Sequence, residues 1–125
     1  MLEKIEISIW GRNFTLPIEY DCYEGESVTD EQKKCVAHIQ EKSECINKSL
    51  PFVRQHFEKS IDADALNCNK DNVFGYLAPH YLFVKREENP RMALMCRCKY
   101  EPEHGFAIVV TGSNDVELGI QDIIL

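Results

Sequence analysis

Apolar residues recur at every second position near both ends of the chain, and this alternation constrains the fold more than any other feature. Residues 3–9 and 14–18 both show it. Strict alternation is typical of a strand with one buried face. Gly11 and the two polar residues after it suit a turn between these strands. We therefore predict an N-terminal antiparallel hairpin, with its second strand at an edge or ending near Pro17, which cannot donate a hydrogen bond.

The middle of the chain changes to an apolar spacing of three and four, which is typical of amphipathic helices. Thr29 begins a Thr-x-x-Gln capping box, so we expect a helix from there to about Asn47. A second helix is expected over residues 50–60, with a proline in its first turn. The polar residues 62–72 are predicted to form a loop.

Alternation returns in the second half of the chain and predicts four more strands. The third strand starts after Pro79, and the others cover residues 92–100, 106–110 and 116–120. The element order ββααββββ predicts an α+β fold, with a mainly antiparallel sheet and two helices packed on one face. No repeat or linker interrupts the pattern, so we expect residues 1–125 to form one domain.

The net charge of the chain limits the classes of molecule that we expect it to bind. Asp and Glu number 21 against 14 Lys and Arg, which gives a net charge of −7. This charge argues against nucleic acid, whose binding depends on clustered Lys and Arg, and it is compatible with a basic protein partner. No apolar run approaches the roughly 20 residues that span a bilayer, so we expect no membrane association. The N-terminus lacks a signal-peptide pattern, which favours a cytoplasmic location and six reduced cysteines.

Cys96 and Cys98 are the first candidates for chemistry. One residue separates them in a predicted strand, so their side chains point to the same face, about 6–7 Å apart. Together with His104 and Cys22 they would complete a tetrahedral zinc site. Structural zinc sites, however, usually take cysteine pairs two to four residues apart. We therefore interpret both cysteines as small core side chains and predict no metal site.

The turn at residues 101–105, Glu-Pro-Glu-His-Gly, is the second candidate. Neighbouring carboxylates stabilise a charged histidine, and a turn brings it within reach of a ligand. Glu103 and His104 are thus the candidate catalytic pair, and Glu101 is a candidate binding residue. The other interpretation is a polar turn whose glycine supplies an unusual backbone angle. His80 is a further candidate binding residue, although its position after a proline equally suits a strand entry.

Short motifs follow one another in a set order in the C-terminal third. The strand that contains Cys98 leads into the Glu-His-Gly turn, a hydrophobic strand follows, and Gly119-x-Gln121-Asp122 closes the pattern. In this order they resemble a family of small uncharacterised bacterial domains. The resemblance implies a domain of unknown function with no established activity, and some similar small acidic proteins serve as immunity proteins beside toxin genes. It draws attention to five residues, which are Glu103, His104, Gly105, Gly119 and Asp122.

Three functions remain open from the sequence. The leading prediction is a non-enzymatic protein-binding module without a cofactor, which includes the toxin-neutralising type. The alternative is a small metal-dependent or acid/base hydrolase centred on Glu103 and His104, with His80 as a further member. Asp122 is a separate candidate binding residue. A third is self-association through the apolar residues 122–125, which would otherwise dock onto the chain's own core. The oligomeric state is left open.

Overall fold

The computed structural model describes residues 3–22, 25–64, 66 and 72–125. Within these residues the chain forms six strands and four α-helices, which confirms the predicted α+β class. In chain order the elements are β1 (Lys4–Ile9), β2 (Arg12–Tyr20), α1 (Asp30–Ala37), α2 (Ile39–Lys48), α3 (Leu50–His56), α4 (Glu58–Ala63), β3 (Leu77–Val84), β4 (Met92–Cys98), β5 (Phe106–Val110) and β6 (Val116–Gly119). Two 3-10 turns, η1 (Val73–Gly75) and η2 (Gln121–Ile123), precede β3 and follow β6.

The six strands form one sheet in the order in which they occur in the chain. Neighbours pair antiparallel except β2 and β3, which run parallel and pair Ile18 with Leu82. The sheet is therefore mixed, which corrects the prediction in part. The helices between β2 and β3 provide the long crossover connection that parallel neighbours need. β2 as a whole lies between β1 and β3, but β3 pairs with it only from Ile18 onward. Pro17 therefore lies in the part of β2 that pairs with β1 alone, which agrees with the expected edge position.

The first hairpin turns at Trp10 and Gly11, one residue earlier than the sequence suggests. Both residues have a positive φ, 48° and 85°, which is the pattern of a type I′ hairpin turn. Tryptophan rarely adopts this conformation. Here α2 supports it, because the Trp10 backbone N–H donates to Asn47 Oδ1 (2.6 Å) and the indole Nε1–H donates to the Ile46 carbonyl (3.0 Å).

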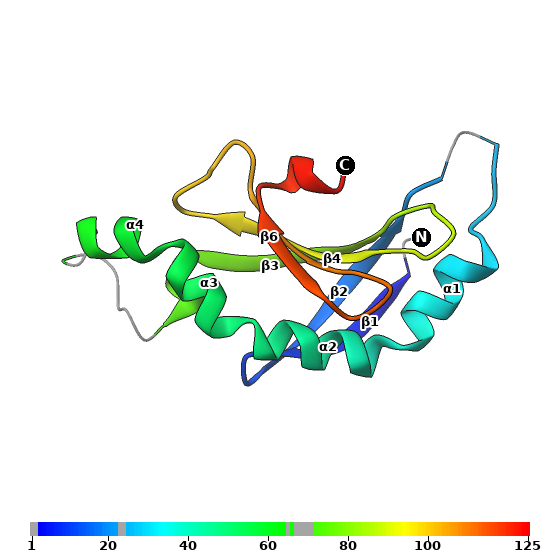
Figure 1. The fold of residues 1–125 in the computed structure, drawn as a ribbon, viewed down its shortest axis with the longest axis horizontal. Coiled ribbons are helices and arrows are strands. Elements are labelled where there is room, and N and C mark those ends of the chain that lie inside the picture. The colour runs from blue at the N-terminus through cyan, green and yellow to red at the C-terminus, as the bar shows by residue number, and fades with distance from the viewer. Residues whose placement is uncertain (1–2, 23–24, 65, 67–71) are drawn as a thin grey trace.

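Each of the two predicted helices is broken into two. The capping box is confirmed, because the Gln32 backbone N–H donates to Thr29 Oγ1 (3.1 Å) and the Thr29 N–H donates to Gln32 Oε1 (2.9 Å). Non-helical residues then interrupt the helices at His38 and Phe57. Figure 1 shows the four short helices following one another along one side of the sheet.

Strand β3 begins at Leu77, before the proline that was expected to precede it. Pro79 pairs with Cys96 of β4, and β2 joins the other side of β3 only at Leu82. The N–H that Pro79 lacks is therefore not needed there. The predicted loop over 62–72 starts inside α4, and residues 65 and 67–71 of it lie outside the described residues.

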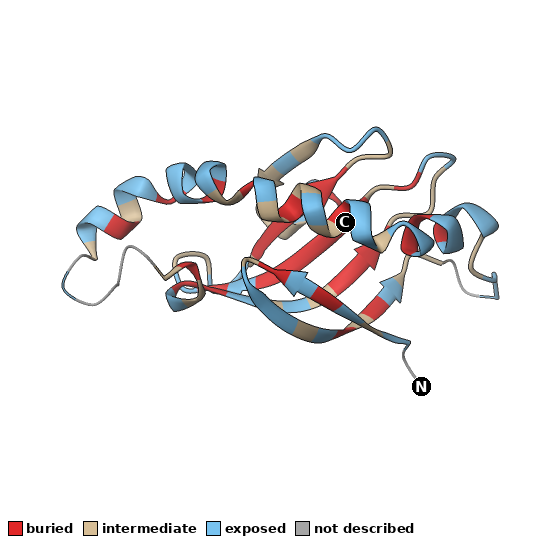
Figure 2. Ribbon diagram, turned by 90° about the horizontal axis from the view of Figure 1, so that it is seen from below, coloured by how far each residue is buried: buried red, intermediate tan, exposed pale blue. Residues whose placement is uncertain are grey.

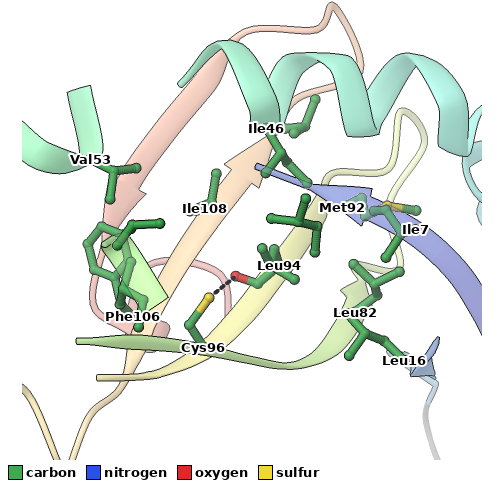
Figure 3. Packing of buried hydrophobic residues seen from close by; sticks show 14 of the residues in the cluster. Ile7, Leu16, Ile46, Val53, Leu82, Met92, Leu94, Cys96, Phe106 and Ile108 are labelled. Carbon is green, nitrogen blue, oxygen red and sulfur yellow. Dashed lines mark hydrogen bonds between the residues drawn. The ribbon is translucent and has the colours of Figure 1, made fainter. Parts of the chain in front are cut away.

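Most of the core lies between the helices and the sheet. In Figure 3, Ile46 and Val53 of the helices point toward Leu94, Phe106 and Ile108 of the strands, all buried. A smaller cluster lies on the opposite face of β3, β4 and β5, where Ile124 packs after η2. Figure 2 shows the pattern that results, with buried strands and with exposed outer faces on the helices.

Candidate functional site

An open groove of about 590 Å³ lies between the helices and the end of the sheet. One wall comes from α2 and the start of α3, and the other comes from the β5–β6 turn and β6. The elements α2, α3 and β6 are labelled in Figure 1. The helix wall consists of Glu41, Glu44, Cys45, Lys48, Ser49 and Phe52, and the strand wall consists of Asn114, Asp115, Val116 and Leu118.

The helical period of α2 creates the first wall. Lys42 and Ile46 are buried on the side that faces the sheet. Ser43 and Asn47, one position further on, both donate to the Ser8 carbonyl of β1 at 2.6 and 3.2 Å. Residues on the remaining flank of α2 face the groove. The helix therefore lies between strand β1 and the β5–β6 turn.

Hydrogen bonds from α2 to the β5–β6 turn join the two walls of the groove. The Lys42 ammonium donates to the Thr111 carbonyl (3.2 Å) and to Asn114 Oδ1 (3.0 Å), although the residue is only 5% exposed. The Cys45 thiol donates to the Asn114 carbonyl (3.6 Å). Asn114 has a φ of 66°, a conformation that asparagine tolerates well. The position of the turn relative to α2 is thus fixed.

Phe52 gives the groove its apolar character. Its side chain is 63% exposed, whereas Val53 on the same helix is fully buried. Val116 and Leu118 are half-buried on the opposite wall and pack against the main core. One exposed aromatic and two half-buried aliphatic side chains thus line the same groove.

The lining of the groove is acidic. Glu41, Glu44 and Asp115 stand against a single cationic side chain, Lys48, among the described residues that line it. Carboxylates on two walls reinforce each other's potential and favour a positively charged ligand. Catalysis is a weaker match, because the described lining holds one thiol and no histidine. A cysteine nucleophile usually works with an adjacent base.

The Glu-His-Gly turn lies at the opposite end of β5 from the groove. Glu103 and His104 are exposed, and Glu101 is half-buried. The backbone of the turn is bonded, since the Gly105 N–H donates to the Glu101 carbonyl (2.8 Å) and the Gln121 N–H donates to the His104 carbonyl (3.2 Å). The backbone of this turn is therefore hydrogen-bonded to the C-terminal segment and helps to position it.

The two glycines of the C-terminal motifs make close packing possible. Gly105 has a φ of 61°, and a Cβ there would lie 2.5 Å from Gln121 Nε2 and 2.8 Å from the Cys96 carbonyl oxygen. Gln121 Nε2 itself donates to that carbonyl at 3.2 Å. At Gly119 a Cβ would lie 2.9 Å from Ile123 Cγ2. Both glycines thus let η2 pack against the sheet.

Cys96 and Cys98 are buried together on the helix face of β4. Burial raises the pKa of both thiols, so each is held as the neutral form. The Cys96 thiol donates weakly to the Leu94 carbonyl (3.9 Å), the contact drawn in Figure 3. His104 is exposed on the turn, and Cys22 is half-buried after β2. Across the described parts of the chain, no group of three or more His, Cys, Asp or Glu side chains is arranged to hold a metal ion.

The remaining predicted residues are dispersed. His80 is exposed at a β-bulge in β3 and its ring contacts Tyr81 edge-on, with centroids 5.1 Å apart. Asp122 is exposed in η2. Neither lines the groove among its described residues.

Sequence reasoning missed the groove itself. The sequence held one signal of the groove, which is the position of Phe52. This residue lies outside the apolar stripe that Val53 and Phe57 continue. An apolar side chain off the buried stripe of an amphipathic helix must face solvent or a partner. Its partner across the groove, Leu118, belongs to a distant strand, so no local pattern joins the two.

The whole chain, residues 1–125, matches the sequence profile of a family described as domain of unknown function (DUF6985). The chain belongs to this family. Membership agrees with the resemblance to an uncharacterised domain family and assigns no activity. No curated protein and no solved structure matches the chain. None of the helices in the described regions is long and apolar enough to cross a bilayer.

Proposed function

We propose that this DUF6985 domain is a non-enzymatic protein-binding module whose groove receives a basic protein partner. The observation that carries the proposal is the combination of Phe52, 63% exposed, with an acidic lining on both walls. Large aromatic side chains contribute much of the binding energy at protein interfaces. Phe52 is the anchor in this proposal, and the carboxylates select the partner.

The charge of the whole chain supports a basic partner. The net charge of −7 and the groove carboxylates have the same sign, so the long-range field and the local field attract the same ligand. Such agreement raises the association rate and excludes acidic competitors. Neutralisation of a basic toxin is one form that this function can take, and the same experiment tests it once the partner is known.

A photo-crosslinking amino acid at position 52 tests the proposal in cells. We expect it to capture a protein of high isoelectric point, whereas the same amino acid in place of Leu66, which is 99% exposed, captures none of it. The affinity of the purified partner is then measured by calorimetry. Glu44→Lys should weaken binding at least about tenfold because it reverses a groove charge.

The matched control is Glu6→Lys, which makes the same charge change. Glu6 is exposed on β1, at the opposite edge of the sheet from β6. The control should keep most of the affinity. The proposal fails if both positions capture the same proteins, or if the two charge reversals weaken binding equally.

A further inference from the structure

The outer edge of β6 presents a row of backbone groups to the groove, with no neighbouring strand among the described residues. The Thr111 backbone N–H donates to the Asp115 carbonyl (2.8 Å), and this bond shows which residues of β6 are hydrogen-bonded to β5. In an antiparallel ladder alternate residues turn their backbone groups to the partner strand. Glu117 therefore bonds to β5, while the N–H and C=O groups of Val116 and Leu118 point away from the sheet.

The opposite edge of the sheet, strand β1, is partly covered by side chains of α2. On β1 the Ser8 carbonyl accepts hydrogen bonds from Ser43 Oγ and Asn47 Nδ2 of α2. Strand edges are usually covered in this way, or blocked by lysine or proline, because open edges pair with other chains. The sequence of β6, Val-Glu-Leu-Gly, contains neither lysine nor proline. The same helix that covers part of β1 leaves a groove beside β6.

We infer that an extended basic segment of the partner pairs with the outer edge of β6 and extends the sheet by one strand. The inference rests on the proposed function and specifies the binding mode. Added strands gain affinity from main-chain hydrogen bonds and specificity from pockets for alternate side chains. Phe52 and Leu118 form the apolar site on the helix side.

The charges specify which side chains such a strand carries. Glu117 is exposed and lies opposite Val109, on the face of the sheet away from the helices. A strand beside β6 thus meets apolar side chains and the α2 carboxylates Glu41 and Glu44 on the helix face, and the Glu117 carboxylate on the other face. Asp115 at the end of β6 adds a further carboxylate. An alternation of aliphatic residues and lysine fits both faces.

The probe is an eight-residue peptide of alternating Lys and Val, acetylated and amidated at its ends. We expect it to shift the NMR signals of Phe52 and Leu118 and to slow amide exchange at Val116 and Leu118 at least about tenfold, because both amides become hydrogen-bonded. A Glu-Val peptide of the same length is the charge control and should not bind.

Two N-methylated isomers isolate the backbone contribution. One carries methyl groups on the valine amides and the other on the lysine amides. A strand pairs through one edge only, so one isomer should lose affinity at least about tenfold while the other keeps it. The inference is overturned if the Phe52 signals shift without slower exchange at Val116 and Leu118, or if both isomers bind like the parent peptide. It is also overturned if the Lys-Val peptide does not bind at all, and crosslinking at position 52 then still decides the proposed function.

Discussion

At the scale of single residues, local sequence signals predict the structure correctly where a side chain acts on its own backbone. The capping box of Thr29 and Gln32 is one case. Trp10 shows where such prediction fails. Nothing near it in sequence favours a positive φ, and the bonds that hold it come from Asn47 and Ile46 of α2. A conformation that distant residues impose cannot be predicted from the turn itself.

Gly105→Ala should lower the free energy of unfolding by about 3 kcal/mol. About 1 kcal/mol comes from an alanine at positive φ, and the rest from the contact of its Cβ with Gln121 and the Cys96 carbonyl. Urea denaturation followed by circular dichroism measures the change. The control is Gly25→Ala, where φ is +80° and nothing lies within 4 Å of the position that the alanine Cβ would take. If the two variants lose equal stability, the close contact between residue 105 and Gln121 contributes nothing to the free energy of unfolding.

At the scale of secondary-structure elements, the strands were predicted closely and the helices only in outline. The strand at residues 106–110 has the predicted bounds because its apolar run is uninterrupted. The breaks at His38 and Phe57 were missed, since neither is a glycine or proline. The parallel pairing of β2 and β3 was also missed. It depends on where four helices return the chain, which alternation does not encode.

The C-terminal turn η2 covers the second face of the sheet, so its side chains can be tested individually. Ile124 is 1% exposed and Ile123 is 38% exposed. Ile124→Ala should cost about 2–3 kcal/mol of unfolding free energy, within the range for a buried isoleucine. Ile123→Ala should cost less than about 1 kcal/mol, because much of its side chain stays in water. Equal losses in thermal or urea melts would contradict the docking of Ile124 onto Met95 and Val109.

The β3–β4 turn contains an ion pair whose contribution depends on pH. Arg91 Nε donates to Glu87 Oε1 (2.8 Å), and this bond, together with nearby positive charge, lowers the pKa of Glu87 below its ordinary value of 4.5. A lowered folded-state pKa stabilises the fold above pH 4.5, and this stabilisation is lost as the pH falls through the lowered pKa.

The variant Glu87→Gln removes that dependence. At pH 7 its free energy of unfolding should be lower than that of the unchanged protein by less than about 1 kcal/mol, because the ion pair is partly exposed. The deficit should shrink as the pH falls from 4.5 toward 2. Urea melts at a series of pH values provide the measurement, and a deficit that grows in acid would contradict a lowered pKa at Glu87.

At the scale of the whole molecule, burial divides the cysteines into two groups. Cys35, Cys96 and Cys98 are buried and have raised pKa values because of burial, whereas Cys22 and Cys45 are half-buried. The remaining cysteine, Cys68, lies outside the described residues. The groove, too, exists only at this scale, because its two walls are distant in sequence. The sequence shows that the whole chain is acidic, but it predicted neither the groove nor the charge of its lining.

Alkylation by iodoacetamide at pH 8 should follow this division. Cys22 and Cys45 should react directly, while Cys96 and Cys98 should react only through unfolding and at least about a hundredfold more slowly, because a neutral buried thiol is not a nucleophile. Peptide mass spectrometry resolves each site. Similar rates at Cys45 and Cys96 would contradict the buried core described for β4.

The parallel pairing of β2 with β3 has a consequence for the order in which the molecule folds. Strands β3 to β6 follow one another with short turns, so their contacts are local and their loop closures are fast. The contact of Ile18 with Leu82, in contrast, closes about half of the chain and carries the entropy cost of a long loop. We therefore expect the C-terminal strands to form first and the N-terminal hairpin to dock onto them afterwards.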